Sequence, residues 1–491
     1  MTGAAGPLVI DGAAIATVDA LGTEHPEGHA VVVDGRIASL GPGPAPPVDG
    51  ARTVDGTGCL LTPGLVNTHH HLYQWATRGY ALDSTLFEWL TELYPIWARV
   101  TQDVVGQAAA AGLAWLARSG CTTTTDHHYL FPRGAGDLLG STVDAAGRIG
   151  LRFHPTRGSM DLGRSQGGLP PDSVVEGLDE ILAASQDAVQ RFHDPAPGAM
   201  VRVALAPCSP FSVSTELLRQ SAALARTLGV RLHTHLAETL DEEEYCRDKH
   251  GCTPVEYLDK LGWLGDDVWL AHAVHLAQAE IGRLGATGTG VAHCPSSNAR
   301  LGAGTAPARA MLDAGVPVGL GVDGAASQEA GRLVDELRQA LYSARSRVDG
   351  RDSASASGPA GSKALSAREA LAMATIGGAC CLGRDDEIGS LEPGKLADLA
   401  LWRLDGLGHA GIADPVAALV FGSAPPLELL TVGGRVIVER DELRTADEAA
   451  LTADLRRASK AVRPHSPPPP TSPVPPTSPV PQITPVPQIK E

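Results

Sequence analysis

The sequence predicts an α/β protein: a (β/α)₈ barrel, the TIM-barrel fold, with a small β-sandwich domain formed by both chain ends. Three observations predict it. Eight short apolar segments alternate with helix-like segments, most of these apolar segments end in polar residues, and both ends of the chain carry hairpin patterns instead.

The eight apolar segments have the length and composition of parallel strands that are covered on both faces. An open doubly wound sheet is the alternative, but that fold needs a glycine-rich phosphate-binding fingerprint, and none follows a strand here. Residues 101–120 give the clearest helix, with Thr101 as N-cap and Gly120 as stop signal. The predicted strands lie within residues 59–71, 121–129, 151–158, 201–210, 231–238, 268–276, 288–298 and 317–324.

Hairpin signals mark the two chain ends. Asp34-Gly35 separates two strand-like runs near the start, and Gly433-Gly434 does the same near the end. We therefore expect one small β-domain built from both termini. Its strand-like segments are 30–42, 396–404 and 427–444.

The predicted β-domain takes residues 1–61 and 388–448, and the predicted barrel takes residues 62–387. Residues 351–363 have the composition of a flexible loop. The Pro-rich tail, residues 464–491, has almost no core-forming residues and is expected to be disordered or polyproline-like. Docking of the tail on an SH3-like partner is the alternative to a solvated tail.

Composition excludes several classes of partner. The formal net charge of −17 repels phosphates, so we expect no nucleic-acid partner. The eight cysteines are irregularly spaced without a CxxC pair, which is typical of reduced thiols in the cytosol. No apolar run reaches the roughly 18 residues of a membrane helix, and the N-terminus lacks a basic signal-peptide region. We expect a soluble cytoplasmic protein with no membrane partner.

The motif NTHHH indicates a metal site at the end of the first barrel strand. Side chains at i and i+2 of a strand face the same way, so His69 and His71 can both point into the barrel mouth while His70 points away. Barrel enzymes place their chemistry at this end of the strands. An HxH pair alone is a moderate signal for metal binding.

Three further residues strengthen the metal interpretation. His235 ends the fifth predicted strand, His272 lies on the sixth and Asp323 ends the eighth. All occupy the same level as the HxH pair, so these side chains should converge on one axis. Neutral imidazoles and a carboxylate suit Zn²⁺ or Fe²⁺, and zinc is the first expectation.

Glu238 lies where the chain leaves the fifth strand and can turn back over the metal as a proton shuttle; a surface glutamate at a helix start is the alternative.

The number of metal ions is inferred from the absence of a lysine on the fourth predicted strand. Two-metal barrel hydrolases commonly use a carboxylated lysine from strand four, but the first lysine is Lys249, beyond Pro210 where that strand ends. We therefore expect one divalent metal ion.

Several motifs resemble the amidohydrolase superfamily: TPGLVNTHHH, HTHLAET, LAHAVHL, HCPSSN, GVDGAASQE and SLEPGKLADLALW. The resemblance covers roughly residues 8–445 and is closest to the single-metal deaminase branch, which includes guanine, cytosine and S-adenosylhomocysteine deaminases and the triazine hydrolases. Within that branch HHLYQ, WLTELYPIWARVT and HCPSSNARL look most similar to bacterial 8-oxoguanine deaminases.

The resemblance implies a role for each matching residue. Glu238 matches the acid that protonates a ring nitrogen, and His272 matches the residue that polarises the metal water. Asp323 takes the proton of that water and passes one to the departing ammonia. The implied metal ligands are His69, His71, His235 and Asp323.

Candidate substrate contacts are Gln74, Trp97 and Arg157. Trp97 stands where related nucleoside deaminases are expected to have an acidic residue for ribose, and an indole favours a flat free base. Gln74 has the donor and acceptor to bond a purine edge. Arg157 has two interpretations, a contact to an oxopurine carbonyl or a structural salt bridge. An apolar stripe at helical spacing has two interpretations, a wall against the substrate or helix packing: Leu86, Phe87, Trp89, Leu90, Leu93 and Tyr94.

The expected function is hydrolytic deamination of an amino-substituted heteroaromatic free base, foremost 8-oxoguanine, to urate plus ammonia. An s-triazine amino- or chlorohydrolase, or another purine or pterin deaminase, is the alternative. A non-catalytic scaffold that binds partners through the Pro-rich tail is disfavoured, since such scaffolds typically lose metal ligands. A homo-oligomer would fit the family.

Overall fold

The structure is a computed structural model that describes residues 6–347 and 363–463. Eight parallel strands close a barrel, and each predicted barrel strand contains one of them, so the fold prediction is confirmed. The strands in barrel order are β6 (Leu65–Asn67), β8 (Cys121–His128), β9 (Arg152–Ser159), β10 (Ala204–Pro207), β11 (Leu232–Leu236), β12 (Val268–His272), β13 (Gly290–His293) and β14 (Val318–Leu320).

Helices surround the barrel. The Thr101 side chain caps α2 by accepting the N–H of Val104 at 3.4 Å, as its sequence predicts. The helices are α1 (Leu86–Trp97), α2 (Gln102–Arg118), α3 (Leu138–Ile149), α4 (Leu178–Phe192), α5 (Thr215–Leu228), α6 (Leu240–His250), α7 (Pro254–Lys260), α8 (Gln278–Thr287), α9 (Pro295–Arg300), α10 (Ala308–Asp313), α11 (Leu333–Ser346), α12 (Ala367–Ala372), α13 (Gly378–Cys381), α14 (Pro415–Phe421) and α15 (Glu448–Val462).

Both chain ends build one mixed sheet of nine strands, which confirms that they fold together. The turns at Asp34-Gly35 and Gly433-Gly434 join antiparallel neighbours as expected. The strands are β1 (Leu8–Ala16), β2 (Glu24–Val33), β3 (Arg36–Pro42), β4 (Arg52–Asp55), β5 (Cys59–Pro63), β16 (Leu399–Arg403), β17 (Leu427–Val432), β18 (Arg435–Glu439) and β19 (Glu442–Leu443). The domain limits given above stay predictions.

A buried ion pair joins the sheet to the barrel. Arg152 on β9 donates from Nε to Asp398 Oδ2 at 2.6 Å and from Nη2 to Oδ1 at 3.1 Å. Trp402 on β16 packs beneath Gly120, where a Cβ atom would lie 2.1 Å from the indole ring. Only glycine fits there, so the end of α2 and the start of β8 depend on it.

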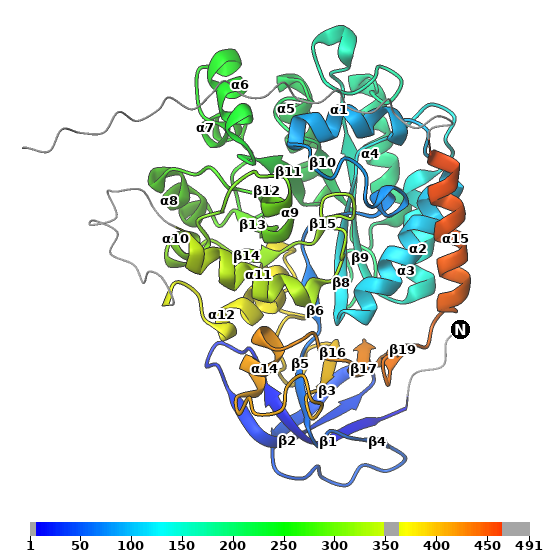
Figure 1. Cartoon of the computed structure of the whole chain (residues 1–491), viewed down its shortest axis with the longest axis vertical. Helices are drawn as coiled ribbons and strands as arrows, with labels where there is room; N and C mark the ends of the chain where they lie inside the picture. Colours follow the sequence, from blue (N-terminus) through cyan, green and yellow to red (C-terminus); the bar gives the residue numbers. More distant parts are fainter. Residues whose placement is uncertain (1–5, 348–362, 464–491) are drawn as a thin grey trace, which may run out of the picture.

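Figure 1 shows the mixed sheet at one end of the molecule and α1 lying across the opposite end of the barrel, with α15 beside α2. Most of the predicted loop 351–363 and the whole predicted tail 464–491 lie outside the described residues. None of the helices in the described ranges is long and apolar enough to cross a membrane. All eight cysteines are free thiols.

Candidate metal centre and active site

The predicted metal residues meet at the carboxyl end of the barrel. His70 and His71 form the two-residue strand β7, which pairs in parallel with β15, Asp323 and Gly324. His235 lies on β11, and the side chains of His69, His71, His235 and Asp323 are all buried. The strand ends therefore bring together residues that are up to 254 positions apart.

Three distances between the ligand atoms of these four residues are close to those of a tetrahedral site. His71 Nε2 lies 3.1 Å from His235 Nε2, and Asp323 Oδ1 lies 3.4 Å from His69 Nε2 and 3.3 Å from His71 Nε2. Tetrahedral zinc has bonds of about 2.0–2.2 Å, which place neighbouring ligands about 3.3–3.6 Å apart. His69 Nε2 is buried without a hydrogen-bond partner among the described residues. The four residues fit a single divalent ion.

Backbone carbonyls fix two of the imidazoles in the tautomer that metal binding requires. His71 Nδ1 donates to the carbonyl of His127 at 2.7 Å, and His235 Nδ1 donates to the carbonyl of Cys208 at 2.6 Å. With the proton on Nδ1, each ring presents the lone pair of Nε2 to the centre.

A second histidine does the same for His69. His69 Nδ1 donates to His233 Nε2 at 2.8 Å, and His233 Nδ1 donates in turn to the carbonyl of Trp269 at 2.8 Å. The His233 ring also stacks on Trp269, with ring centroids 4.4 Å apart. The orientation of His69 is therefore set by a chain of two hydrogen bonds and one stacked ring.

The electrostatics suit a cation. Burial lowers the pKa of His69, His71 and His235, which keeps these imidazoles neutral. Burial alone would raise the pKa of Asp323, but His69 and the other nearby histidines hold it well below its usual range. Three neutral imidazoles and one ionised carboxylate form a donor set that zinc prefers.

Two serine hydroxyls bind the second carboxylate oxygen of Asp323. Oδ2 accepts the hydroxyls of Ser297 at 2.6 Å and Ser327 at 3.2 Å, while Oδ1 faces the histidines. The backbone at Asp323 has a φ of 59°, which is uncommon for a residue other than glycine. Such conformations persist where the surroundings over-determine them.

Glu238 and His272 stand beside this centre. His272 Nε2 lies 3.6 Å from Glu238 Oε2 and 4.0 Å from Asp323 Oδ2, and His272 Nδ1 donates to Asn298 Oδ1 at 2.9 Å. Burial raises the pKa of Glu238 to about 7. Glu238 can therefore carry a proton near neutral pH. Although burial opposes it, Glu238 and Asp323 raise the pKa of His272.

A narrow cavity opens above these groups. Its remaining walls come mostly from α1 and from the segments that follow β8 and β10, with Gln74 and Leu301 beside them. The lining residues are His71, Gln74, Leu86, Trp89, Leu90, Tyr94, Tyr129, Cys208, Ser209, Phe211, His235, Glu238, His272, Leu301 and Asp323.

Among the predicted substrate contacts only Gln74 lines the cavity. Trp97 is fully buried behind it and donates its indole N–H to Thr77 Oγ1 at 3.0 Å. Arg157 binds Glu176 through Nη2 at 2.7 and 2.9 Å and lies over the ring of Phe131. The structure places Trp97 in packing and Arg157 in a salt bridge, away from the cavity.

Sequence reasoning missed part of the site. Of the α1 stripe, Leu86, Trp89, Leu90 and Tyr94 line the cavity, which the packing interpretation does not predict. His127 was also missed: its Nδ1 or Nε2 lies within 4.8 Å of ligand atoms of the histidine cluster. Its Nε2 is 3.0 Å from the carbonyl of Ala206 and its ring stacks on His235, so it packs against a proposed ligand. The adjacent histidines in TTDHHY were the signal.

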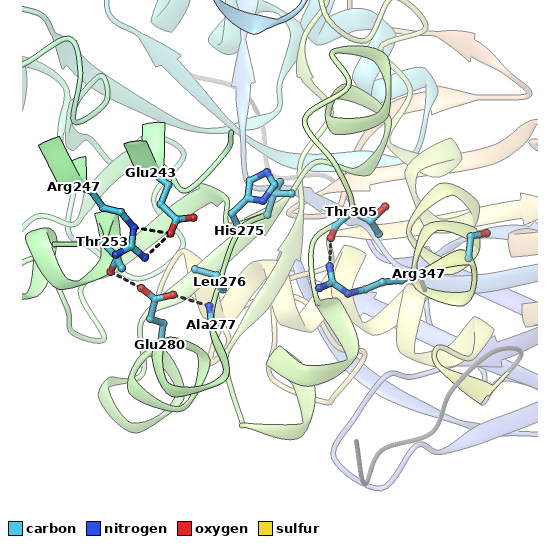
Figure 2. Close-up of a pocket in the computed structure, with 11 residues that line it drawn as sticks. Glu243, Arg247, Thr253, His275, Leu276, Ala277, Glu280, Thr305 and Arg347 are labelled. Atoms are coloured by element: carbon cyan, nitrogen blue, oxygen red, sulfur yellow. Dashed lines mark hydrogen bonds and ion pairs between the residues drawn. The ribbon is translucent and has the colours of Figure 1, made fainter. Parts of the chain in front are cut away.

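A wider cleft lies on the outside of the barrel, with about 1180 Å³ of space against about 410 Å³ for the cavity (Figure 2). Its charged groups are engaged with each other and with the backbone. Glu243 binds Arg247, and Glu280 accepts Thr253 and the N–H of Ala277. It contains none of the clustered histidines.

Comparison with known proteins places this geometry in a family. Residues 60–437 match the model of the Amidohydrolase family. The chain is 47% identical to 8-oxoguanine deaminase of Pseudomonas aeruginosa over 89% of this chain and 95% of that protein. It is 37% identical to hydroxydechloroatrazine ethylaminohydrolase of Pseudomonas sp. strain ADP over 89% of this chain and 92% of that protein.

A solved structure agrees. Atrazine chlorohydrolase from Arthrobacter aurescens TC1, complexed with zinc, has a TM-score of 0.86 and 36% identity, covering 92% of this chain and 100% of that chain. The chain therefore belongs to the amidohydrolase family, among its metal-dependent deaminases.

Proposed function

We propose that this protein deaminates a free heteroaromatic base, with 8-oxoguanine as the substrate, to urate and ammonia. The observation that carries the proposal is the position of Glu238, a buried carboxyl with a pKa near 7 that lines the cavity beside His272 and Asp323. The 47% identity to an 8-oxoguanine deaminase over most of both chains supports the choice of base.

We assign the metal ligands as His69, His71, His235 and Asp323, with zinc as the ion and Fe²⁺ as the alternative. A zinc-bound relative of 36% identity supports zinc. A divalent ion bound there would lower the pKa of its water from about 15.7 to about 7 and supply hydroxide at neutral pH.

The chain's own groups then move the protons. Asp323 accepts the proton of the attacking water. Glu238 gives its proton to the ring nitrogen next to the amino-bearing carbon, which makes that carbon electrophilic. His272, whose Nδ1 is held by Asn298, can donate from Nε2 to the oxyanion when it is protonated. Asp323 finally gives its proton to the amino group, which leaves as ammonia, and Glu238 recovers a proton from the hydroxyl that has added to the ring.

The cavity walls favour a flat, uncharged guest. Aromatic and aliphatic side chains make up about half of them, and neither arginine nor lysine occurs among the described residues that line the cavity. A phosphate-bearing nucleotide would have no arginine or lysine to pair with there. Gln74 offers both a donor and an acceptor to a ring edge.

An s-triazine is the second candidate substrate. Its support is the similarity to two triazine-converting relatives, one of them a structure with a TM-score of 0.86. The same metal ligands and proton-transfer residues would carry out this reaction, because only the leaving group differs: it is an amine or chloride.

Ammonia release from a panel of free bases, pterins and triazines by zinc-loaded protein tests the proposal. We expect 8-oxoguanine to give the highest kcat/KM. Activity on triazines alone would favour the second candidate, and no release from any amino-substituted ring would refute both.

We also propose that the protein works in the cytoplasm, which agrees with eight free cysteines. A homo-oligomer stays a prediction, which the mass in solution would test.

A further inference from the structure

The turn that carries Glu238 has an unusual backbone. Ala237, between β11 and Glu238, has a φ of 52°, and the matching turn after β12 has φ values of 73° at His272 and 49° at Ala273. Left-handed conformations are strained at residues other than glycine, so neighbouring contacts must hold them. Both candidate proton-transfer residues, Glu238 and His272, therefore sit at turns that depend on outside support.

Glu242 supplies that support to the first turn. Its Oε1 accepts the N–H of Ala237 at 2.9 Å and its Oε2 accepts the N–H of Glu238 at 3.1 Å. Glu242 is the third residue of α6, and its side chain is fully buried. In an ordinary capping box a glutamate at this position returns to the N-cap N–H, here Thr239, but this carboxylate reaches further back along the chain.

The same turn is tied to the end of β12. The carbonyl of Ala237 accepts the N–H groups of Val274 and His275, each at 2.9 Å, and the carbonyl of Leu236 accepts Ala273 at 3.1 Å. The Ala237 backbone is thus held by Glu242 on its N–H and by the turn after His272 on its carbonyl.

We infer that Glu242 is a positioning residue for the proton transfer: it fixes the Ala237–Glu238 turn, and through that turn the register of Glu238 with His272. This inference rests on the role proposed for Glu238. Glu242 does not line the cavity, so it acts through Glu238 and not on the substrate.

A carboxylate is the side chain that this geometry needs, because two acceptors must meet two N–H donors. Glutamine offers one acceptor and one NH₂ group, and the NH₂ group would face an N–H. Glu243 gives a matched control. It is the next residue of α6, but it faces the outer cleft and binds Arg247 through Oε1 at 2.7 Å (Figure 2).

The first test compares Glu242→Gln with Glu243→Gln in zinc-loaded protein. We expect Glu242→Gln to lower kcat by about tenfold to a hundredfold, the effect of a misplacement of roughly 1 Å. KM and the zinc content per chain should stay within twofold, and Glu243→Gln should match the wild type. Equal kcat values for wild type and Glu242→Gln would overturn the inference.

A double-mutant cycle separates positioning from a general structural role. In the Glu238→Gln background, followed in single turnovers with excess enzyme, Glu242→Gln should cost less than twofold, because its target is already lost. A cost equal to that in the wild-type background would overturn the inference. If Glu242→Gln does not fold, Glu242→Asp replaces it, with a smaller loss of kcat that must also vanish in the Glu238→Gln background.

Hydrogen exchange keeps the test independent of the substrate. Backbone N–H groups of Ala237 and Glu238 should exchange faster in Glu242→Gln than in Glu243→Gln, with the rest of the barrel unchanged. Unchanged exchange at these two groups would refute the inference. The wild type could prove inactive on every base while exchange at this turn is still faster in Glu242→Gln. That result would count against the proposed function, but not against the role of Glu242 in holding the turn.

Discussion

The hydrogen bond from His69 to His233 makes a prediction about metal affinity. A metal bound to His69 Nε2 requires the ring proton on Nδ1, where it donates to His233. In His233→Phe the aromatic contact with Trp269 can persist, but the acceptor is gone. Without metal, the ring proton of His69 can move to Nε2, so Nδ1 has no N–H that lacks an acceptor. With a metal on Nε2, the proton must stay on Nδ1, where it is a buried N–H without an acceptor.

The magnitude follows from that asymmetry. A buried donor left without a partner costs about 1–3 kcal/mol. At about 1.4 kcal/mol per factor of ten, zinc affinity should fall roughly 5-fold to 150-fold. Loss of outer partners of metal-binding histidines typically has an effect of about 10-fold to 100-fold, which agrees.

Zinc dissociation constants from competition with a chromophoric chelator measure the effect without any substrate. His154→Phe is the matched control: His154 is also buried beside Trp269, with ring centroids 5.7 Å apart, but none of its hydrogen bonds goes to a proposed ligand. His233→Gln keeps an acceptor near the position of Nε2 and should retain most of the affinity. Equal zinc affinity in His233→Phe and His154→Phe would refute the reasoning.

Three further predictions concern the proton route, the buried ion pair between sheet and barrel, and the candidate substrate contacts. Glu238→Gln should lower turnover by about 10²-fold to 10⁴-fold and keep its metal, whereas Asp323→Asn should lose both, as ammonia release and elemental analysis would show; an active Glu238→Gln contradicts the proton route. Asp398→Asn breaks the buried pair with Arg152 and should cost about 3–5 kcal/mol in urea unfolding; a loss below 1 kcal/mol would contradict this estimate. Trp97→Phe should lower stability by about 0.5–1.5 kcal/mol and leave KM unchanged, and Gln74→Ala should raise KM; the opposite pattern would restore Trp97 as a substrate contact.

The barrel and the proposed ligands could be predicted because their signals are local. An HxH pair on a strand faces one way by geometry, and the carboxyl ends of parallel strands all meet at one face of a barrel. His69, His71, His235 and Asp323 needed no knowledge of side-chain packing, only of strand direction. The structure places His69, His71 and His235 in one buried group of possible metal ligands, and Asp323 in a second group that shares His69.

The positions of Trp97 and Arg157 outside the cavity lining could not be predicted, because they depend on partners far away in the sequence. Arg157 binds Glu176, which is 19 residues away in a segment without regular structure. The sequence pattern does not identify this glutamate as its partner. Trp97 satisfies its N–H on Thr77, which turns it from the cavity. A stripe on α1 looks the same in sequence whether it packs on a protein core or on a substrate cavity.

The arrangement separates chemistry from recognition. The proposed metal residues belong to strand ends fixed by the barrel, while much of the cavity wall comes from α1 and from loops, which accept substitution more easily. Relatives at 36–47% identity carry names that differ in the ring and the leaving group, which is what such a division permits.

The division is not complete, because Trp89 on α1 donates its indole N–H to the carbonyl of Ala326, three residues beyond Asp323, at 3.0 Å. Ser327, the next residue, donates to Asp323 itself. A change of substrate that moved α1 would therefore pull on the loop that holds Asp323. The discrimination between 8-oxoguanine and a triazine is best sought in wall residues that leave this bond intact, such as Leu86, Leu90 and Tyr94.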